Sequence, residues 1–518
     1  MLGLLLAATA ALMLHLSRGL TFNLDEWTVV TERRGPGAPS LLEPHNEHLS
    51  VLILGALLAL LKIGGLDAQA LMMAPLIAMQ LALGVLLFVV ARRRVGAGIA
   101  VGVAALALLS GLAYENFLVP GQAGQMASIV AGVAAFAVLD LPRTRRTDLA
   151  IAGLLTLALA SSGMGIPVLA GIVVELLATR ENRERLWVAG APFGLYLVWY
   201  LAYGTNRADF DELGVSALWA WTAVNHAAGT IIGERQVEPG RDFLIVVLLI
   251  LAYRAWRTQP PARIRMAALA TVLVTFYGLT GLSRHDIAPP SSSRYLTVGL
   301  VFLLLLLVEA GRGLRVRRWA PFAVLLLALV SFSKDNTLGF KEGRAILLER
   351  SQRVLGSLGA VDLLGRERVD PQLEVAPLAA PLLRADGWFD ARDALRGNPA
   401  YSAAELPGAP APARDSADDT LVRAGGLAVR PPGTPPRRCR PAWSGDGGTV
   451  PPGGVRIQAG DGAPLTLRAR RFGNAWITVL VLPLPAGRAV RLHPLSDAAG
   501  RPYTVQASGA ARTCVLGP

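Results

Sequence analysis

Charged residues are scarce in this sequence of 518 residues. They make up 17% of it, whereas hydrophobic residues make up 53% and the mean hydropathy is +0.45. A soluble protein cannot cover its surface with so few polar side chains, which excludes a cytosolic enzyme, a secreted protein and a disordered chain. The composition therefore indicates a membrane protein.

Lysine is almost absent as well, because only three of the fifty basic residues are lysine. The net charge of +13 does not indicate nucleic-acid binding, since the basic residues form short clusters between apolar runs instead of one stripe. The sequence contains no Walker P-loop, Rossmann fingerprint, GxSxG elbow or CxxC pair. ATP-driven transport by this chain alone is therefore unsupported.

Eleven apolar segments have roughly the length that a helix needs to cross a bilayer core of about 30 Å. They cover residues 2–16, 67–91, 96–113, 123–140, 148–162, 165–179, 186–203, 241–256, 264–282, 295–311 and 319–333. Arginine clusters fall on alternate loops and mark those loops as cytoplasmic. The clusters are Arg92–Arg94, Arg143–Arg146, Arg180–Arg185, Arg254–Arg265 and Arg312–Arg318. We therefore predict a multi-pass membrane protein with its N-terminus inside and its tail outside.

The tail differs in composition from the membrane domain, which we place at 1–333. Twenty of the 34 prolines lie beyond residue 370, and charges become frequent after Phe332. We predict an outer helical segment at 334–404, a Pro/Gly-rich linker at 405–454 and a small β domain at 455–518. Strands are expected at 455–458, 465–469, 475–482, 489–492, 503–507 and 513–515. The tail thus reads as an extracytoplasmic α+β domain that ends in a sandwich-like β fold.

The two cysteines, Cys439 and Cys514, bracket the expected strands. An outer compartment is oxidising, so we predict that they form a disulfide. In the chain-entropy model this bond would stabilise the domain by about 4 kcal/mol. Two unpaired thiols are the alternative.

The densest polar cluster lies in the first outer loop, 17–66. It comprises Asp25-Glu26-Trp27 and the block Glu43-Pro44-His45-Asn46-Glu47-His48, which precedes an apolar run at 49–64 that we interpret as a helix in the membrane interface. Charged groups at a membrane boundary are unfavourable against lipid, so such a cluster indicates a site. Paired carboxylates can accept a proton, hold a cation or bind sugar hydroxyls. A solvated loop with an N-capping aspartate is the alternative.

His45 and His48 are three residues apart, which places both imidazoles on one side of a helix or turn. With the neighbouring carboxylates they suit a transition metal, a hard cation such as Mg, Mn or Ca, or direct contact with a sugar. We favour Glu47 or His48 contacting substrate, and we rank structural, hydrogen-bonding histidines above metal ligands. If a cation binds, we name Asp25 and His48 as its ligands.

Two further polar groups lie in later outer loops. The first is Tyr114-Glu115-Asn116 with Gln122 and Gln125, for which helix capping is the alternative. The second contains Arg284, His285, Arg294 and Tyr295. Both arginines run against the charge bias of outer loops, which indicates an anionic partner such as a lipid phosphate; headgroup snorkelling is the alternative.

Residues 1–333 resemble bacterial GT-C-type membrane glycosyltransferases. The resemblance rests on four blocks: Asp25-Glu26, Pro44-His45-Asn46-Glu47-His48, Tyr114-Glu115-Asn116 with Gln122, and Ser293-Arg294-Tyr295-Leu296. It implies transfer of a sugar from a polyprenyl-phosphate carrier to a glycan, lipid or protein acceptor outside the bacterial cytoplasmic membrane, usually with inversion. Asp25 then matches the first-loop acidic residue, as the base or as the group that orients the acceptor, and Glu26 assists it or binds a cation. Arg294 or Arg284 then holds the departing lipid phosphate.

Two other functions remain open at this stage. A transporter or flippase would use the polar cluster as a gate, and it predicts charges at mid-depth and paired half-repeats. A non-catalytic cell-envelope assembly protein would use the outer tail to bind partners. The glycosyltransferase reading requires Asp25, His48, Glu115 and Arg294 to line one outward cavity.

Overall fold

The computed structural model describes residues 1–33, 38–205, 208–315, 317–433, 443, 447–460, 464–484, 488–495, 497 and 499–515. These residues form two compact units. Unit one comprises Met1–Arg18, Ala38–Ile63 and Ala68–Ala345. Unit two comprises Gly19–Gly37, Gly64–Asp67 and Ile346–Pro518.

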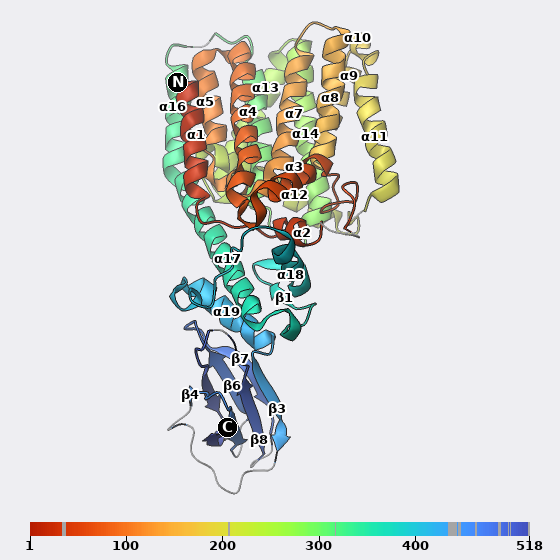
Figure 1. Cartoon of the computed structure of the whole chain (residues 1–518). Coiled ribbons are helices and arrows are strands. Elements are labelled where there is room, and N and C mark those ends of the chain that lie inside the picture. The colour runs from red at the N-terminus through yellow and green to blue at the C-terminus, as the bar shows by residue number, and fades with distance from the viewer. Residues whose placement is uncertain are drawn as a thin grey trace. The chain divides into compact units, whose positions relative to one another are not determined.

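Unit one is a helical bundle (Figure 1). Each of the eleven predicted segments forms a helix. These are α1 (Leu2–Leu16), α4 (Gln69–Val95), α5 (Ala97–Leu108), α7 (Ala123–Leu139), α8 (Arg145–Ser161), α9 (Gly165–Leu177), α11 (Trp187–Tyr203), α13 (Val237–Arg257), α14 (Pro260–Arg284), α15 (Ser293–Ala310) and α16 (Ala320–Ser331). Shorter or additional helices are α3 (Val51–Gly64), α6 (Glu115–Leu118), α10 (Arg180–Arg183) and α12 (Leu213–Ile232).

Within the described part of the chain, six helical stretches are long and apolar enough to cross a membrane. They are Gln69–Val95, Pro120–Leu139, Arg180–Tyr203, Pro260–Arg284, Ser293–Ala310 and Ala320–Leu364. Three other predicted segments form apolar helices of fewer than 18 residues, namely α1, α5 and α9. The predicted polytopic α-helical architecture is therefore present, while the number of crossings stays a prediction.

The loops that carry arginine clusters gather at one end of the bundle, which we call the basic end. There, Arg94 at the end of α4 and Arg265 near the start of α14 both pair with Asp140 at the end of α7. At the other end, which we call the opposite end, Glu115 of the short helix α6 pairs with Arg294 at the start of α15. The helix directions thus agree with the alternation of loops predicted from the arginines.

Helix α12 lies between the predicted segments 186–203 and 241–256, in a stretch where the sequence predicts no helix. Near its start, Ser216 Oγ lies 3.4 Å from His285 Nδ1, just beyond the end of α14. Near its end, the Thr230 carbonyl accepts a hydrogen bond from Ser331 Oγ at the end of α16. Both ends of α12 therefore lie at the opposite end of the bundle. Its polar residues obscured the helix in the sequence, but Trp219 and Ala223 are buried against the bundle.

Close helix contacts in unit one depend on glycine. A Cβ on Gly171 of α9 would lie 2.5 Å from Val272 Cγ2 and 2.7 Å from the Ala268 carbonyl oxygen, both on α14. Small residues at such contacts are typical of membrane helices. Of the six stretches that are long and apolar enough to cross a membrane, α15 is the most enclosed, because 83% of it is buried inside the structure. It therefore fixes Arg294 and Tyr295 firmly at the opposite end.

Unit two combines helices with antiparallel sheets (Figure 1). Its helices are α2 (Glu26–Thr31), the later part of α17 (Thr337–Leu364), α18 (Ala385–Ala394) and α19 (Ala411–Arg423). Strands β1 (Glu374–Ala376) and β2 (Ala380–Arg384) form a hairpin. Two four-stranded sheets follow, with the orders β10-β5-β8-β3 and β4-β9-β6-β7. The strands are β3 (Leu427–Gly433), β4 (Gly447–Thr449), β5 (Val455–Ala459), β6 (Leu465–Arg470), β7 (Ile477–Leu482), β8 (Ala489–Pro494), β9 (Thr504–Ser508) and β10 (Ala510–Val515).

The predicted linker at 405–454 is wrong in part, because it contains α19, β3 and β4. Helix α19 is held by tertiary contacts that composition does not reveal. The buried carboxylate of Asp418 accepts hydrogen bonds from the backbone N–H groups of Arg471, Phe472 and Gly473 at 2.7–3.1 Å. The proline-rich composition predicts a linker here, but long-range hydrogen bonds hold this part of the chain in regular structure.

The first outer loop is also divided differently from the prediction. Its segment Gly19–Gly37 belongs to unit two instead of the predicted membrane domain. The reason is aromatic packing, because the Trp27 ring lies edge-on to Phe22 and Trp388 at centroid distances of 5.2 and 6.3 Å.

Candidate functional site

The block His45-Asn46-Glu47-His48 forms a tight turn at the opposite end of unit one. His45 and His48 exchange two backbone hydrogen bonds of 3.1 Å. The two central residues, Asn46 and Glu47, have φ values of +50° and +70°. Asn tolerates this conformation, whereas Glu adopts it rarely. The two histidines are thus partners across a turn and not neighbours along a helix.

The turn places Glu47 against an arginine from a distant helix. Arg284 at the end of α14 donates from Nη2 to Glu47 Oε2 at 3.1 Å, and both side chains are mostly buried. His48 lies beside Gly163, where a Cβ would come within 2.7 Å of the imidazole. Burial, the Arg284 charge and His45 lower the pKa of His48 to about 4. At neutral pH, His48 is therefore uncharged.

A second ion pair joins the short helix α6 to the start of α15. Buried Glu115 accepts a hydrogen bond of 2.7 Å from Ser293 Oγ, and its Oε2 lies 3.4 Å from Arg294 Nε. Gln125 Nε2 donates to the Arg294 carbonyl oxygen at 2.7 Å. Three of the predicted residues, Glu115, Gln125 and Arg294, are therefore brought together.

Tyr295, which follows Arg294 on α15, is enclosed by the bundle. Its ring is buried against Trp219 of α12 at a centroid distance of 5.6 Å, and Tyr277 donates to its carbonyl oxygen at 3.0 Å. Tyr295 is thus held within the bundle by its ring contacts and by a backbone hydrogen bond.

Other predicted residues of unit one have different surroundings. Asn116 is fully buried, and its backbone oxygen accepts a hydrogen bond of 2.8 Å from Gln80 of α4. His285 contacts Glu212 and the Gly281 carbonyl, and these contacts raise its pKa. Asn116 and His285 are therefore held by helix packing.

Three more predicted residues lie at the margins of unit one. The Tyr114 ring packs over Gly343. Glu43 is exposed and accepts a hydrogen bond from the Ser40 backbone. Gln122 is half-buried at the start of α7. The predicted roles of these three residues in substrate binding stay predictions.

Asp25, Glu26 and Trp27 lie in unit two. Asp25 is half-buried and precedes α2, directly after Leu24, which has a φ of +41°. The buried Glu26 accepts a hydrogen bond of 2.7 Å from the Asn23 backbone. Trp27 is fully buried in the aromatic packing described above, so its side chain exposes no surface for the predicted contact with substrate. The roles of Asp25 and Glu26 stay predictions.

The predicted metal site and disulfide also stay predictions. Among the described residues, no three His, Cys, Asp or Glu side chains are grouped so that they could hold a metal ion. The two named ligands, Asp25 and His48, belong to different units. Cys514 is buried on β10, whereas Cys439 lies outside the described residues.

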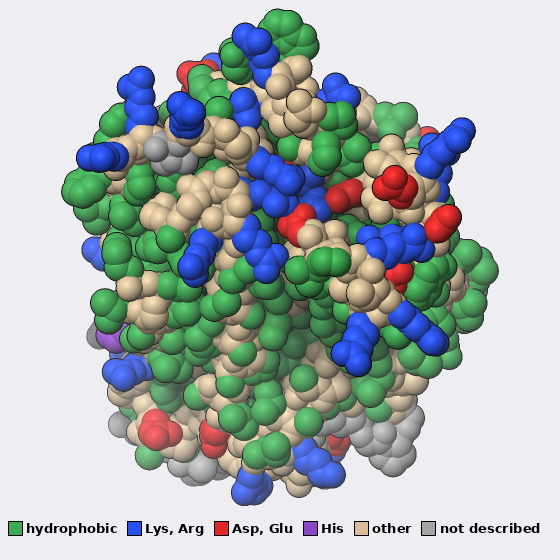
Figure 2. Space-filling model, turned by 90° about the horizontal axis from the view of Figure 1, so that it is seen from above, with side chains coloured by type: hydrophobic (Ala, Val, Ile, Leu, Met, Phe, Trp, Pro, Cys, Tyr) green, Lys and Arg blue, Asp and Glu red, His purple; other side chains and the backbone are tan. Residues whose placement is uncertain are grey.

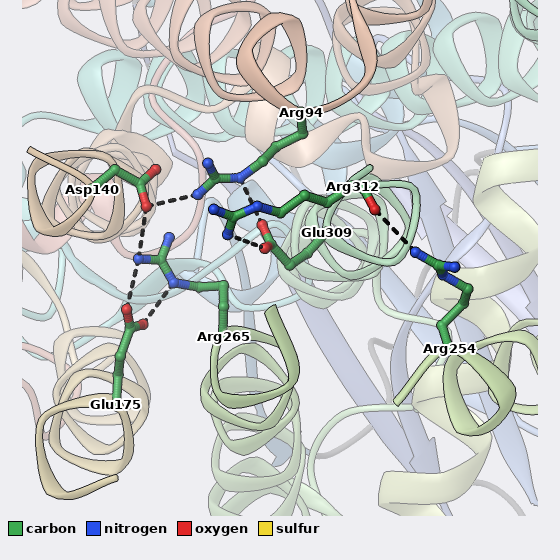
Figure 3. Close-up of polar contacts among 7 residues, drawn as sticks. All are labelled: Arg94, Asp140, Glu175, Arg254, Arg265, Glu309 and Arg312. Carbon is green, nitrogen blue, oxygen red and sulfur yellow. Dashed lines mark hydrogen bonds and ion pairs between the residues drawn. The ribbon is translucent and has the colours of Figure 1, made fainter. Parts of the chain in front are cut away.

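The sequence reading missed a buried ionic network at the basic end. Its members come from five helices: Arg94 (α4), Asp140 (α7), Glu175 (α9), Arg265 (α14), and Glu309 and Arg312 (α15) (Figure 3). Figure 2, which looks down on this end, shows arginines with a few carboxylates among them. In the sequence, these arginines indicate only which loops are cytoplasmic. The signal that could have revealed the network is the presence of acidic residues at the ends of apolar segments.

One solved structure resembles this fold. It is the crystal structure of ArnT from Cupriavidus metallidurans bound to undecaprenyl phosphate, with a TM-score of 0.45 and 13% sequence identity. The match covers 82% of this chain and 92% of the other. No family model matches the sequence, and no curated protein is significantly similar to it. At this TM-score, the likeness does not by itself assign the chain to a family.

Proposed function

We propose that this protein is an inverting GT-C-type glycosyltransferase of the bacterial cytoplasmic membrane. It would transfer a sugar from a polyprenyl-phosphate carrier to a cell-envelope glycan, lipid or protein. Eleven helices would cross the membrane, with the basic end inside and the opposite end and unit two outside. One observation carries the proposal: Arg284 and Arg294, from two helices, are each held by a carboxylate, Glu47 and Glu115, at the end of the bundle that should face outside.

The arginines suit the phosphate of the carrier. Arg284 contacts Glu47 through one nitrogen. A guanidinium has five N–H donors, so an anionic ligand can bind without breaking this pair. The ion pairs with Glu47 and Glu115 keep both cations in place before the substrate arrives. Preorganised positive charge stabilises a departing phosphate most in a site with little water.

The reaction needs a proton acceptor as well. A bond forms between the acceptor oxygen and the sugar C1 while the bond from C1 to the phosphate oxygen breaks. The phosphate leaves with that electron pair, and the hydroxyl proton passes to a carboxylate. We assign the carboxylate to Asp25, assisted by Glu26, following the sequence resemblance. Such a base is typically worth about two to four orders of magnitude in rate.

Binding of the carrier can be measured without knowing the sugar. Purified protein should retain undecaprenyl phosphate in native mass spectrometry, and Arg284→Ala and Arg294→Ala should each weaken retention by about tenfold or more because a charge-assisted contact is lost. Arg241→Ala is the matched control, because Arg241 is an exposed arginine on α13 that pairs with its neighbour Asp242. Equal retention by all three variants would remove the proposed phosphate site.

Transfer is tested separately with Asp25→Asn. The variant should bind the carrier as the wild type does but fail to move labelled sugar to envelope acceptors in membranes. Full transfer by this variant would remove Asp25 as the base. Binding of the carrier without transfer by the wild type would instead favour a flippase.

A further inference from the structure

Three arginines stand side by side on the sheet β10-β5-β8-β3 of unit two. The register pairs Arg491 of β8 with Arg430 of β3 on one side and with Arg456 of β5 on the other. Directly opposed residues of an antiparallel pair project from the same face, with Cβ atoms about 4.5–5.5 Å apart. The side chains therefore form a row across three strands.

This row lies on the face that points away from the core. The alternating residues Val455, Ile457, Val490 and Leu492 are buried almost completely and form the other face. Arg430 and Arg491 are exposed, whereas Arg456, Ala489 and Cys514 on the same face are buried. The exposed pair is thus accessible, and Arg456 adds positive charge next to it.

The exposed pair Arg430 and Arg491 is electrostatically unfavourable as it stands. Like charges directly opposite each other destabilise a sheet. Neither Arg430 nor Arg491 forms an ion pair with a carboxylate among the residues the structure describes. The neighbouring His493 reports the same field, because burial and the charges of Arg430 and Arg491 lower its pKa. An anion on this face would remove the repulsion.

The other described residues of this face indicate what kind of anion it would be. Ala428, Gln458 and His493 are partly exposed on it, and Ala489 and Cys514 are buried. A face that binds a membrane carries large apolar side chains, and these residues are small or polar. Neighbouring strands are about 4.7–4.9 Å apart, so Arg430 and Arg491 can together contact one anionic group or two successive ones. These features fit a hydrated polymer with repeated charges.

We propose that this arginine row binds an anionic glycan, with Arg430 and Arg491 contacting its phosphate or carboxylate groups. A glycan fits because unit two is predicted to lie outside the cell membrane, where nucleic acid is not the expected polyanion. The proposal stands on the strand register and the charges, and it does not depend on the transfer reaction.

Full-length protein in zwitterionic nanodiscs provides the test. We expect it to bind fluorescent polygalacturonate or phosphorylated dextran but not neutral dextran, with an affinity that falls as salt rises. Arg491→Gln should weaken binding by about tenfold. Arg468→Gln is the matched control, because Arg468 is an exposed arginine on β6 of the other sheet; its binding should stay within about twofold of wild type.

Stability separates binding from a structural role. Without ligand, Arg491→Gln should leave the unfolding temperature unchanged or raise it, since it removes like-charge repulsion. A lowered unfolding temperature together with weakened binding would indicate a structural arginine and overturn the proposal. Wild-type affinity in Arg491→Gln would also overturn it. So would stronger binding to phosphatidylglycerol vesicles or to DNA than to the charged glycans.

Discussion

Strained backbone marks the polar clusters of this protein. Four non-glycine residues in the described part of the chain have positive φ: Leu24, Asn46, Glu47 and Leu382. Three of them adjoin clusters that the sequence singles out. Each such residue costs about 1–3 kcal/mol and persists where its surroundings hold it. At Glu47 these are the two hydrogen bonds of the turn and the ion pair with Arg284.

His48 should make the protein sensitive to acid. Its folded-state pKa of about 4 lies below the ordinary value of 6.5, so the unfolded chain takes up the proton first as pH falls. Stability should therefore be complete above about pH 6.5 and decline toward pH 4, by on the order of 3 kcal/mol at most. Thermal unfolding of His48→Gln across this range should show a smaller decline than wild type.

His285 provides a control of opposite sign. Its pKa is raised by the Gly281 carbonyl and by Glu212. Its stabilising contribution is thus present at low pH and is lost as pH rises through the folded pKa. In a plot of stability against pH, His285→Gln should therefore reduce the loss of stability that occurs as pH rises. If His48→Gln and wild type lose stability in parallel between pH 6.5 and 4, the buried neutral imidazole is not the cause.

Sequence spacing found the ionic residues of the site but not their orientations. Glu47, Glu115, Arg284 and Arg294 stand out because charges are rare near apolar segments, and the structure pairs them. Trp27 stands in the same kind of cluster, yet it is buried in the core of unit two. An aromatic residue beside charges suits a surface or a core equally well, so local sequence could not decide its role.

Five helices depend on one charge-balanced network at the basic end. Arg265 donates to both oxygens of Glu175 at 2.6 and 2.7 Å and to Asp140 at 3.1 Å (Figure 3). Three arginines and three carboxylates of the network compensate one another. Buried charges are tolerated only when paired in this way. The network therefore holds the helices of this end in one arrangement.

A double-mutant cycle should measure this coupling. Arg265→Met leaves Glu175 buried without its bidentate partner and should destabilise the bundle by about 3 kcal/mol or more. Adding Glu175→Met should recover more than half of that loss, because no unpaired charge remains at that position. Thermal unfolding in detergent measures both changes. Asp242→Asn, which breaks the exposed pair with Arg241, should change stability by less than about 1 kcal/mol.

Helices were easier to predict than the elements of unit two. Apolar runs specify membrane helices directly, which explains why all eleven segments appear as helices. The register of β5 and β8, and the docking of α19 through Asp418, depend on partners far along the chain. In the double-mutant cycle at the basic end, additive effects of Arg265→Met and Glu175→Met would contradict the proposed coupling, since they would mean that Arg265 and Glu175 act independently.

The distribution of arginine over the chain makes a prediction about its topology. If all eleven apolar helices cross, the odd number puts the C-terminus on the side opposite the N-terminus. If only the six longest stretches cross, the even number puts both on one side. The arginine clusters support eleven crossings, because they fall on alternate loops only when every segment is counted as a crossing.

Reporter fusions distinguish the two counts. Alkaline phosphatase fused after Pro518 should be active and green fluorescent protein dark, because eleven crossings place this position outside. A fusion after Arg257 should give the reverse result, since eight of the eleven helices precede it, whereas only three of the six longest stretches do. A fusion after Arg146 lies inside under both counts and serves as the control. An inactive phosphatase after Pro518 together with an active one after Arg257 would establish six crossings, and it would place unit two on the side where the carrier sugar is not expected.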